Sequence, residues 1–83
     1  MNFTVLWTSA AEQALAAIWI EAEDRSKITH AADAIELSLR TEPVSAGESR
    51  SGDSRVLSIF PLVVLFNVDL LDRKVKVWAI WRY

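Results

Sequence analysis

The side chains that could bind a charged ligand lie mostly in the carboxyl-terminal half of this chain. Arg55 opens a strand-like segment, and its guanidinium group could bind phosphate through a fork of donors. Arg50 precedes it in a segment rich in serine and glycine, from which it could reach a phosphate or an acidic partner. Lys74 and Lys76 alternate with apolar residues, and such a mixed surface could hold a nucleic acid. These residue types favour the recognition of an anion.

Acid–base, thiolate and metal chemistry have little support in this sequence. His30 is the single histidine, the residue type best suited to proton transfer near neutral pH. It falls in the first turns of a helical segment and far along the chain from Arg55, so we expect an exposed helix residue rather than a catalytic one. The chain has no cysteine, which removes a thiolate nucleophile and a disulfide framework. With neither a glycine-rich phosphate loop nor a cluster of metal ligands, the sequence implies no cofactor and no metal.

The formal net charge is -2, and it is divided unevenly along the chain. Up to residue 46 there are three basic residues and seven acids, whereas from residue 47 onward six basic residues meet four acids. A negative net charge argues against a protein that simply coats nucleic acid, because sequence-independent phosphate binding depends on an excess of lysine and arginine. The first half is therefore acidic and the second mildly basic.

A chain of 83 residues is long enough for one domain with one core. The apolar share of 52% exceeds that of a typical domain, so some apolar side chains should remain exposed for a partner to cover. The longest apolar run, Ile59–Phe66, contains Pro61 and is shorter than the roughly 18 residues of a membrane span. The first residues lack the pattern of a secretory signal. We expect a cytoplasmic protein with no membrane partner.

The amino-terminal segment predicts a strand followed by a helix. Phe3–Trp7 alternates in polarity, as a strand with one buried face does. Ser9 and Glu12 have the spacing of a capping box, which predicts a helix over Ser9–Glu23. Five apolar residues of this helix share one stripe and are expected to face the sheet: Ala11, Leu15, Ile18, Trp19 and Ala22.

A second helix follows with almost no linker, which predicts a helical hairpin. Asp24 and Ser26 could both accept hydrogen bonds from free amides at its start. Pro43 ends it, because proline disfavours helical geometry in the residue before it. Its apolar stripe comprises Ile28, Ala31, Ala32, Ile35 and Leu39.

The carboxyl-terminal half predicts a three-strand antiparallel meander. Val44–Ser54 concentrates serine, glycine and charge and is expected to be the main flexible loop. Three strands follow over Arg55–Phe60, Leu62–Val68 and Lys74–Trp81, and the middle one is apolar enough to be buried on both faces. Asp69–Arg73 forms the second turn. The predicted fold class is α+β with the order β-α-α-β-β-β.

The four tryptophans are many for this length. Trp7 and Trp19 lie on apolar stripes, so both are expected in the core. Strict alternation places Trp78 with Lys74, Lys76 and Ile80 on one face of the last strand, and Trp81 with Val75, Val77 and Ala79 on the other. At most one of Trp78 and Trp81 can then join the core, and the other is expected on a surface that a partner covers.

The order of elements and the residues that form them resemble the RelE/ParE superfamily of bacterial toxins, whose genes lie beside an antitoxin gene. The stretch "DRSKITHAADAIELSLRTEP" (24–43) resembles the family's second helix, "GESR" (47–50) its loop, and "RVLSIFPLVVLFNVDLLDRKVKVWAI" (55–80) its sheet. The likeness covers nearly the whole chain, so residues 1–83 are expected to form one toxin domain. It implies a type II toxin-antitoxin, or plasmid stabilisation, system in which the toxin inhibits growth.

The superfamily has two activities, and the resemblance bears on both. RelE-like members cut messenger RNA on the ribosome, which requires groups that activate the 2′-hydroxyl, neutralise the phosphate and protonate the leaving oxygen. Arg55 matches a position where such enzymes place a basic residue, and Arg82 and Tyr83 lie near their arginine and base-stacking aromatic. Each also has a structural interpretation: Arg55 keeps an edge strand solvated, while Arg82 solvates a frayed end against which Tyr83 packs. Leu62–Val64 replaces the arginine that these enzymes carry early in the third strand.

The apolar third strand and the negative charge favour a ParE-like protein, which poisons DNA gyrase. An RNA endonuclease with Arg55, Arg82 and Tyr83 as catalytic groups remains the alternative, as does an inactive member of the fold that only binds a partner. The resemblance further implies an antitoxin that lays an apolar helix or strand along a groove beside the sheet. We expect Trp78 and Trp81 to bind the antitoxin, and Arg50, Lys74 and Lys76 to contact the target, gyrase or ribosome with message.

Overall fold

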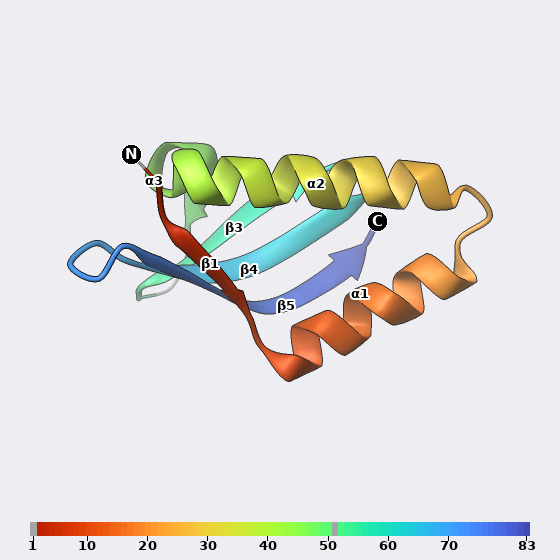
Figure 1. The fold of residues 1–83 in the computed structure, drawn as a ribbon, viewed down its shortest axis with the longest axis horizontal. Helices are drawn as coiled ribbons and strands as arrows, with labels where there is room; N and C mark the ends of the chain where they lie inside the picture. The colour runs from red at the N-terminus through yellow and green to blue at the C-terminus, as the bar shows by residue number, and fades with distance from the viewer. Residues whose placement is uncertain (1, 51) are drawn as a thin grey trace.

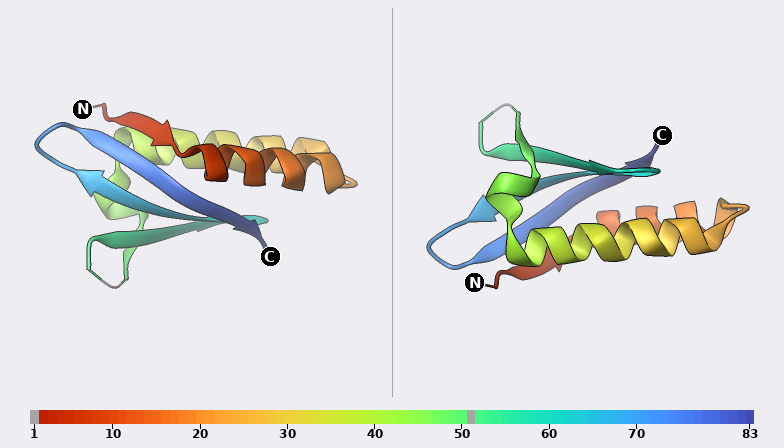
Figure 2. Two further views of the ribbon diagram at one scale, coloured as in Figure 1. Left: turned by 90° about the horizontal axis from the view of Figure 1, so that it is seen from below. Right: turned by 90° about the horizontal axis from the view of Figure 1, so that it is seen from above.

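The computed structural model describes residues 2–50 and 52–83, which form a mixed sheet with helices on one side (Figures 1 and 2). The α+β class is confirmed, and the described residues add two short elements to the predicted order. In chain order the elements are β1 (Thr4–Trp7), α1 (Ser9–Glu21), α2 (Arg25–Thr41), α3 (Pro43–Ala46), β2 (Glu48–Ser49), β3 (Ser54–Ile59), β4 (Leu62–Asp69) and β5 (Lys74–Arg82).

The strands lie in the order β1-β5-β4-β3-β2. The predicted meander is present, because β3, β4 and β5 pair antiparallel in succession. The first strand pairs parallel with the last, with Val5 opposite Val75 and Trp7 opposite Val77. Such a parallel pair needs a long crossover, and the helices supply it. The first and last strands of the chain are therefore neighbours, and β1 covers the outer edge of β5.

The core lies between the helices and the sheet. The second helix buries the stripe that its sequence predicted, with Ile35 and Leu39 fully buried. They pack in one cluster with buried side chains of the two central strands, including Phe66 and Val77. The stripe of α1 is less complete, because Ala11 is buried while Leu15 and Ile18 are half-buried. The sheet thus has one face that packs against helices and one that does not.

The first helix is capped by Thr8 rather than by the predicted Ser9. Thr8 is extended, with φ of -66° and ψ of 157°, and its hydroxyl accepts a hydrogen bond of 3.1 Å from the amide of Ala11. Ser9 is already the first helical residue and therefore cannot act as the cap. At the second helix the prediction is confirmed for Asp24, whose carboxylate accepts a bond of 3.2 Å from the amide of Lys27, whereas Ser26 already lies within the helix.

A Thr8→Ala variant is expected to lower the free energy of unfolding by about 1 kcal/mol, because the amide of Ala11 loses its acceptor. The matched control is Ser9→Ala, which removes a neighbouring hydroxyl and should change stability by less than about 0.5 kcal/mol. Urea denaturation of both variants measures the difference. A larger loss for Ser9→Ala than for Thr8→Ala would contradict this assignment of the cap.

The predicted loop Val44–Ser54 is more ordered than expected. It contains α3, with Pro43 buried at its first position, and β2, which pairs antiparallel with β3. Proline suits the first turn of a helix because the amide it lacks would have no helical partner there. The prediction of a loop was wrong over residues 44–46 and 48–49, because short elements depend on tertiary contacts more than on local propensity. Ser51 of the predicted loop lies outside the described residues.

The last strand contains a bulge that overturns the predicted assignment of its faces. The register shifts so that Phe66 lies opposite Val77 while Leu65 lies opposite Ala79, which leaves Trp78 without a partner in β4. After the bulge, the even-numbered residues of β5 face the core instead of the odd-numbered ones. Ile80 is therefore buried in the core beside Val64, and Trp81 lies opposite Val63 on the other face. The prediction that Trp78 and Trp81 point to opposite faces was wrong.

Candidate functional site

The face of the sheet away from the helices, called the outer face here, gathers several residues that the sequence singled out. Its exposed members come from the first and last strands. Lys76 lies across from Leu6, and its ammonium group sits 4.8 Å from the centre of the Trp78 ring, a cation–π contact. Leu6, Trp78 and Trp81 are 42%, 47% and 45% exposed. The defining residues of the outer face are Leu6, Lys74, Lys76, Trp78 and Trp81.

Acidic side chains limit the positive charge of this face. A depression of about 740 Å³ beside the two lysines is also lined by Asp53, Asp69 and Asp72. The turn between β4 and β5 adds two apolar residues at its rim, of which Leu71 is 97% exposed. Coulomb attraction for a polyanion is weak where carboxylates alternate with ammonium groups. The outer face is therefore better suited to a protein surface than to a phosphate backbone.

Arg55 has a structural role that the sequence did not reveal. Its Nη2 donates hydrogen bonds of 2.6 Å to the Val44 carbonyl and 2.8 Å to the Gly47 carbonyl, which ties α3 and the following residue to β3. The Nε atom is buried and has no hydrogen-bond partner within the described residues. Arg55 pairs with Phe66, so it lies on the helix side of the sheet. One of its two terminal nitrogens, Nη2, is thus bonded to backbone carbonyls.

Arg82 and Tyr83 lie at the far end of the sheet from Arg55. Arg82 is opposite Leu62 and Arg55 is opposite Phe66, a separation of four positions along β4 or about 13 Å. The Tyr83 ring meets Phe60 edge to face, with 5.5 Å between centroids, and its amide donates to the Pro61 carbonyl. Tyr83 therefore packs on the turn between β3 and β4, not on Arg82. The fold does not bring the three catalytic candidates together.

Arg50 and His30 are both exposed, and neither belongs to the residues that define the outer face. The Arg50 guanidinium lies 3.6 Å from the Glu48 carboxylate, a pair with both side chains more than half exposed. Such pairs contribute little to stability. His30 is exposed in α2, as predicted. Among the described residues, no group of acidic or histidine side chains could hold a metal ion.

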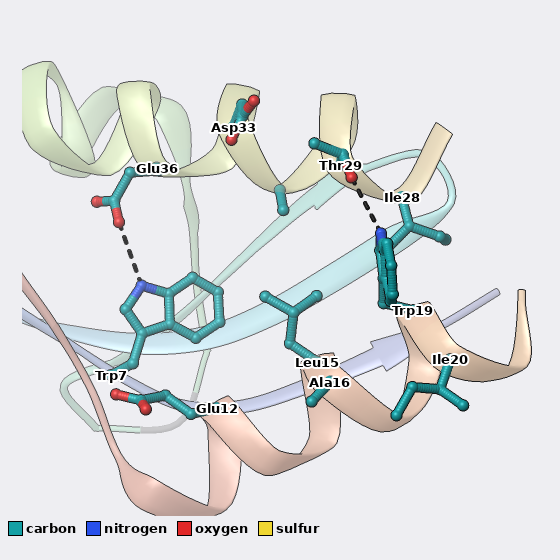
Figure 3. A pocket seen from close by; sticks show the side chains of 11 residues that line it. Trp7, Glu12, Leu15, Ala16, Trp19, Ile20, Ile28, Thr29, Asp33 and Glu36 are labelled. Atoms are coloured by element: carbon teal, nitrogen blue, oxygen red, sulfur yellow. Dashed lines mark hydrogen bonds between the residues drawn. The ribbon is translucent and has the colours of Figure 1, made fainter. Parts of the chain in front are cut away.

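A second surface, called the helical cleft here, lies between α1 and α2 (Figure 3). It has a volume of about 680 Å³ and is open to solvent. Trp7 lies at one end, where its Nε1 donates a weak hydrogen bond of 3.4 Å to the Glu36 carboxylate. Trp19 lies at the other end, where its Nε1 donates to the Thr29 hydroxyl at 3.2 Å.

The sequence placed Trp19 in the core, and that prediction was wrong. Its side chain is 42% exposed, although it lies near the connection between the two helices and bonds across to α2. Arg25 stacks on its ring at 4.7 Å and donates to the carbonyls of Trp19 and Ile20. These bonds satisfy free carbonyls at the end of α1. Helical periodicity identified the stripe, but the packing of the assembled fold decided how much of it is buried.

None of the helices within the described ranges is long and apolar enough to cross a membrane.

Comparisons with known proteins place this arrangement among toxin structures. No protein-family model matches the sequence, and no curated protein matches it either. A chain of the RelBE2 toxin-antitoxin complex from Mycobacterium tuberculosis matches with a TM-score of 0.81 at 16% identity, with 100% of both chains covered. A chain of the chromosomal ParDE system from P. aeruginosa matches with a TM-score of 0.71 at 23% identity, over 98% of this chain and 96% of that one.

The intact RelBE toxin-antitoxin complex of E. coli gives a TM-score of 0.68 at 11% identity, over 98% of this chain and 96% of that one. Identities this low establish the fold and not the activity. The chain therefore has the RelE/ParE fold that the resemblance in its sequence predicted.

Proposed function

We propose that this chain is the toxin of a type II toxin-antitoxin system, acting in the cytoplasm to inhibit growth until a cognate antitoxin neutralises it. The observation that carries the proposal is the outer face, where Trp78 and Trp81 remain nearly half exposed on a RelE/ParE fold. Exposed tryptophans on an otherwise well-packed small domain are typical of binding surfaces. The antitoxin is proposed to cover these two side chains.

Within this proposal a ParE-like action on DNA gyrase is favoured. The lysines of the outer face, Lys74 and Lys76, share their depression with three aspartates, which suits a protein target better than RNA. Nη2 of Arg55 is bonded to two backbone carbonyls, and β4 begins with apolar residues. Arg50 remains an exposed candidate for contact with the target.

One observation supports the alternative, a RelE-like endonuclease acting on ribosome-bound message. Arg82 and Tyr83 are exposed together at the carboxyl end, and the paired rings of Tyr83 and Phe60 offer a surface on which a base could stack. An inactive member of the fold that only binds a partner is the third possibility.

Induced expression of the intact chain in bacteria tests the toxin proposal directly. Growth is expected to stop on induction and to resume when a cognate antitoxin is co-expressed. Normal growth while the folded chain accumulates would overturn the proposal and favour the inactive alternative. For a growth-arresting chain, purified protein is then assayed for inhibition of gyrase supercoiling and for cleavage of ribosome-bound message. Cleavage without gyrase inhibition would replace the ParE-like assignment with the RelE-like one.

Trp78→Ala is expected to weaken antitoxin binding about tenfold, because truncating an interface tryptophan commonly removes about 1 kcal/mol or more of binding free energy. Leu37→Ala is the matched control, since Leu37 is 53% exposed on α2, away from the outer face. Affinity is measured by calorimetry with the purified antitoxin. Equal affinities of the two variants would remove Trp78 from the interface.

A further inference from the structure

Thr8 connects the first helix to the last strand through four hydrogen bonds. Its carbonyl accepts from the amide of Glu12 at 2.9 Å, and its hydroxyl accepts from the amide of Ala11 at 3.1 Å. Its own amide donates to the Val77 carbonyl at 3.0 Å, and its hydroxyl donates to the Trp78 carbonyl at 3.4 Å. The first two bonds hold the start of α1, and the other two reach β5 at its bulge.

The bulge explains why one residue can bond to two successive carbonyls of β5. In a regular strand such carbonyls point to opposite edges. Here the carbonyls of Val77 and Trp78 both point toward Thr8, because the extra residue changes the direction of one peptide group. The amide of Thr8 serves one of them, and β1 ends at Trp7. The Thr8 hydroxyl therefore supplies a donor that the ladder between β1 and β5 does not.

The register of β5 does not depend on this hydroxyl. Val77 is fully buried before the bulge and Ile80 is 6% exposed after it, so core packing fixes the strand on both sides. The Thr8 hydroxyl acts instead on the peptide group of Trp78, which has no opposite residue in β4. The direction of that peptide group determines how the Trp78 side chain leaves the strand. The ring then lies 4.8 Å from the ammonium group of Lys76 on the outer face.

We propose that Thr8 is a positioning residue for the outer face, whose hydroxyl orients Trp78 for the partner without belonging to the binding surface. The identity of that partner as the antitoxin rests on the proposed function, whereas the orientation of Trp78 does not. The side chain at this position must accept from the amide of Ala11 and donate to the Trp78 carbonyl at the same time. A hydroxyl does both, but a carboxylate only accepts. Aspartate is therefore a good helix cap that cannot hold Trp78.

Thr8→Asp separates the two roles in the isolated chain. It keeps an acceptor for the amide of Ala11, so its melting temperature should stay within about 4 °C of the parent. The ring current of Trp78 is expected to move the ε-methylene protons of Lys76 upfield in nuclear magnetic resonance spectra, because the ammonium group lies over the ring. Thr8→Asp should lose at least about half of this shift. Thr8→Ser keeps the hydroxyl and should retain it, and Trp78→Ala defines its absence.

Ser9→Asp is the matched control for the added charge. It places the same carboxylate one residue later, at an exposed position of α1, and should leave the Lys76 signals unchanged. The proposal is overturned if Thr8→Asp keeps the full shift, if Thr8→Ser loses it, or if Ser9→Asp has as large an effect. It is also overturned if the Lys76 signals of the parent and of Trp78→Ala coincide. These outcomes do not depend on toxicity.

Binding of the antitoxin used for the Trp78→Ala measurement extends the test to the partner. Thr8→Asp should weaken its binding about threefold to tenfold. In the Trp78→Ala background the same change should cost less than about twofold, because Thr8 acts through Trp78. Equal losses in both backgrounds would contradict the positioning role. If the parent chain binds no antitoxin, the proposed function fails, and the Lys76 signals still decide whether Thr8 orients Trp78.

Discussion

The Arg55→Ala variant is expected to unfold with a free energy about 3 kcal/mol lower than that of the parent chain. The substitution removes two hydrogen bonds from a charged donor, one to Val44 and one to Gly47. Such bonds contribute about 1.5–3 kcal/mol each, and part of that is recovered when water reaches the freed carbonyls. Urea denaturation followed by tryptophan fluorescence measures the loss.

Arg50→Ala is the control for Arg55→Ala. It removes an arginine five positions earlier that only pairs with Glu48 on the surface, and it should change stability by less than about 0.5 kcal/mol. If the two variants were equally stable, Arg55 would not hold α3 to the sheet, and its guanidinium group would be available for phosphate. The expected loss also means that reduced activity of Arg55→Ala is not by itself a sign of catalysis. Arg55→Lys, which keeps a donor, is a better probe of chemistry.

Gly47→Ala is expected to destabilise the chain by about 3 kcal/mol. A Cβ atom at this position would lie 2.5 Å from Cζ of the Phe66 ring, and that ring is fully buried in the core. Overpacking of this kind commonly costs about 1–3 kcal/mol, and the buried ring has little room to move. The same methyl would lie 3.4 Å from the Val56 carbonyl oxygen, so it cannot avoid the ring by moving toward that backbone. Urea denaturation again provides the measurement.

A smaller residue at position 66 provides the control for this mechanism. In the Phe66→Leu background, Gly47→Ala should lose at least about 1 kcal/mol less stability than in the parent chain, because the clash with the ring is relieved. Gly52→Ala behaves differently, since Gly52 has a φ of 62° and a methyl group there would meet no described atom within 4 Å. Its loss of about 1 kcal/mol comes from the left-handed backbone and should be unaffected by Phe66→Leu. Strictly additive losses for Gly47→Ala and Phe66→Leu would contradict the proposed contact.

The meander and the second helix could be predicted from sequence because their signals are local and strong. The stripe from Ile28 to Leu39 repeats at helical spacing, and all of its members are buried or half-buried as expected. Asp24 caps the helix it was assigned to. The apolar run Leu62–Val64 predicts burial on both faces, and all three residues are buried in the sheet. Each of these properties depends on period and residue type, which are local features of the chain.

Less of the candidate site could be predicted from the sequence, because the site depends on strand register and on contacts between different elements. One extra residue at Trp78 inverts the faces of the last strand, and nothing in the alternation of residues 74–77 indicates it. The partners of Arg55 belong to α3 and the residue after it, a region that was expected to be a loop. The cap at Thr8 in place of Ser9 shows the same limit, since both hydroxyls could serve and only the backbone angles select one.

The fold class, the order of the main elements, the acidic character of the helical half and the surplus of apolar side chains could all be obtained from the order of residues. Those features follow from composition and from the two periods of secondary structure. Which surfaces stay uncovered depends instead on the assembled fold. The bulge set Trp78 and Trp81 on one outer face, and the packing of α1 and α2 left the cleft between Trp7 and Trp19. A strand's register and the packing of two helices are set by contacts across the whole molecule, so no single segment of the chain contains them.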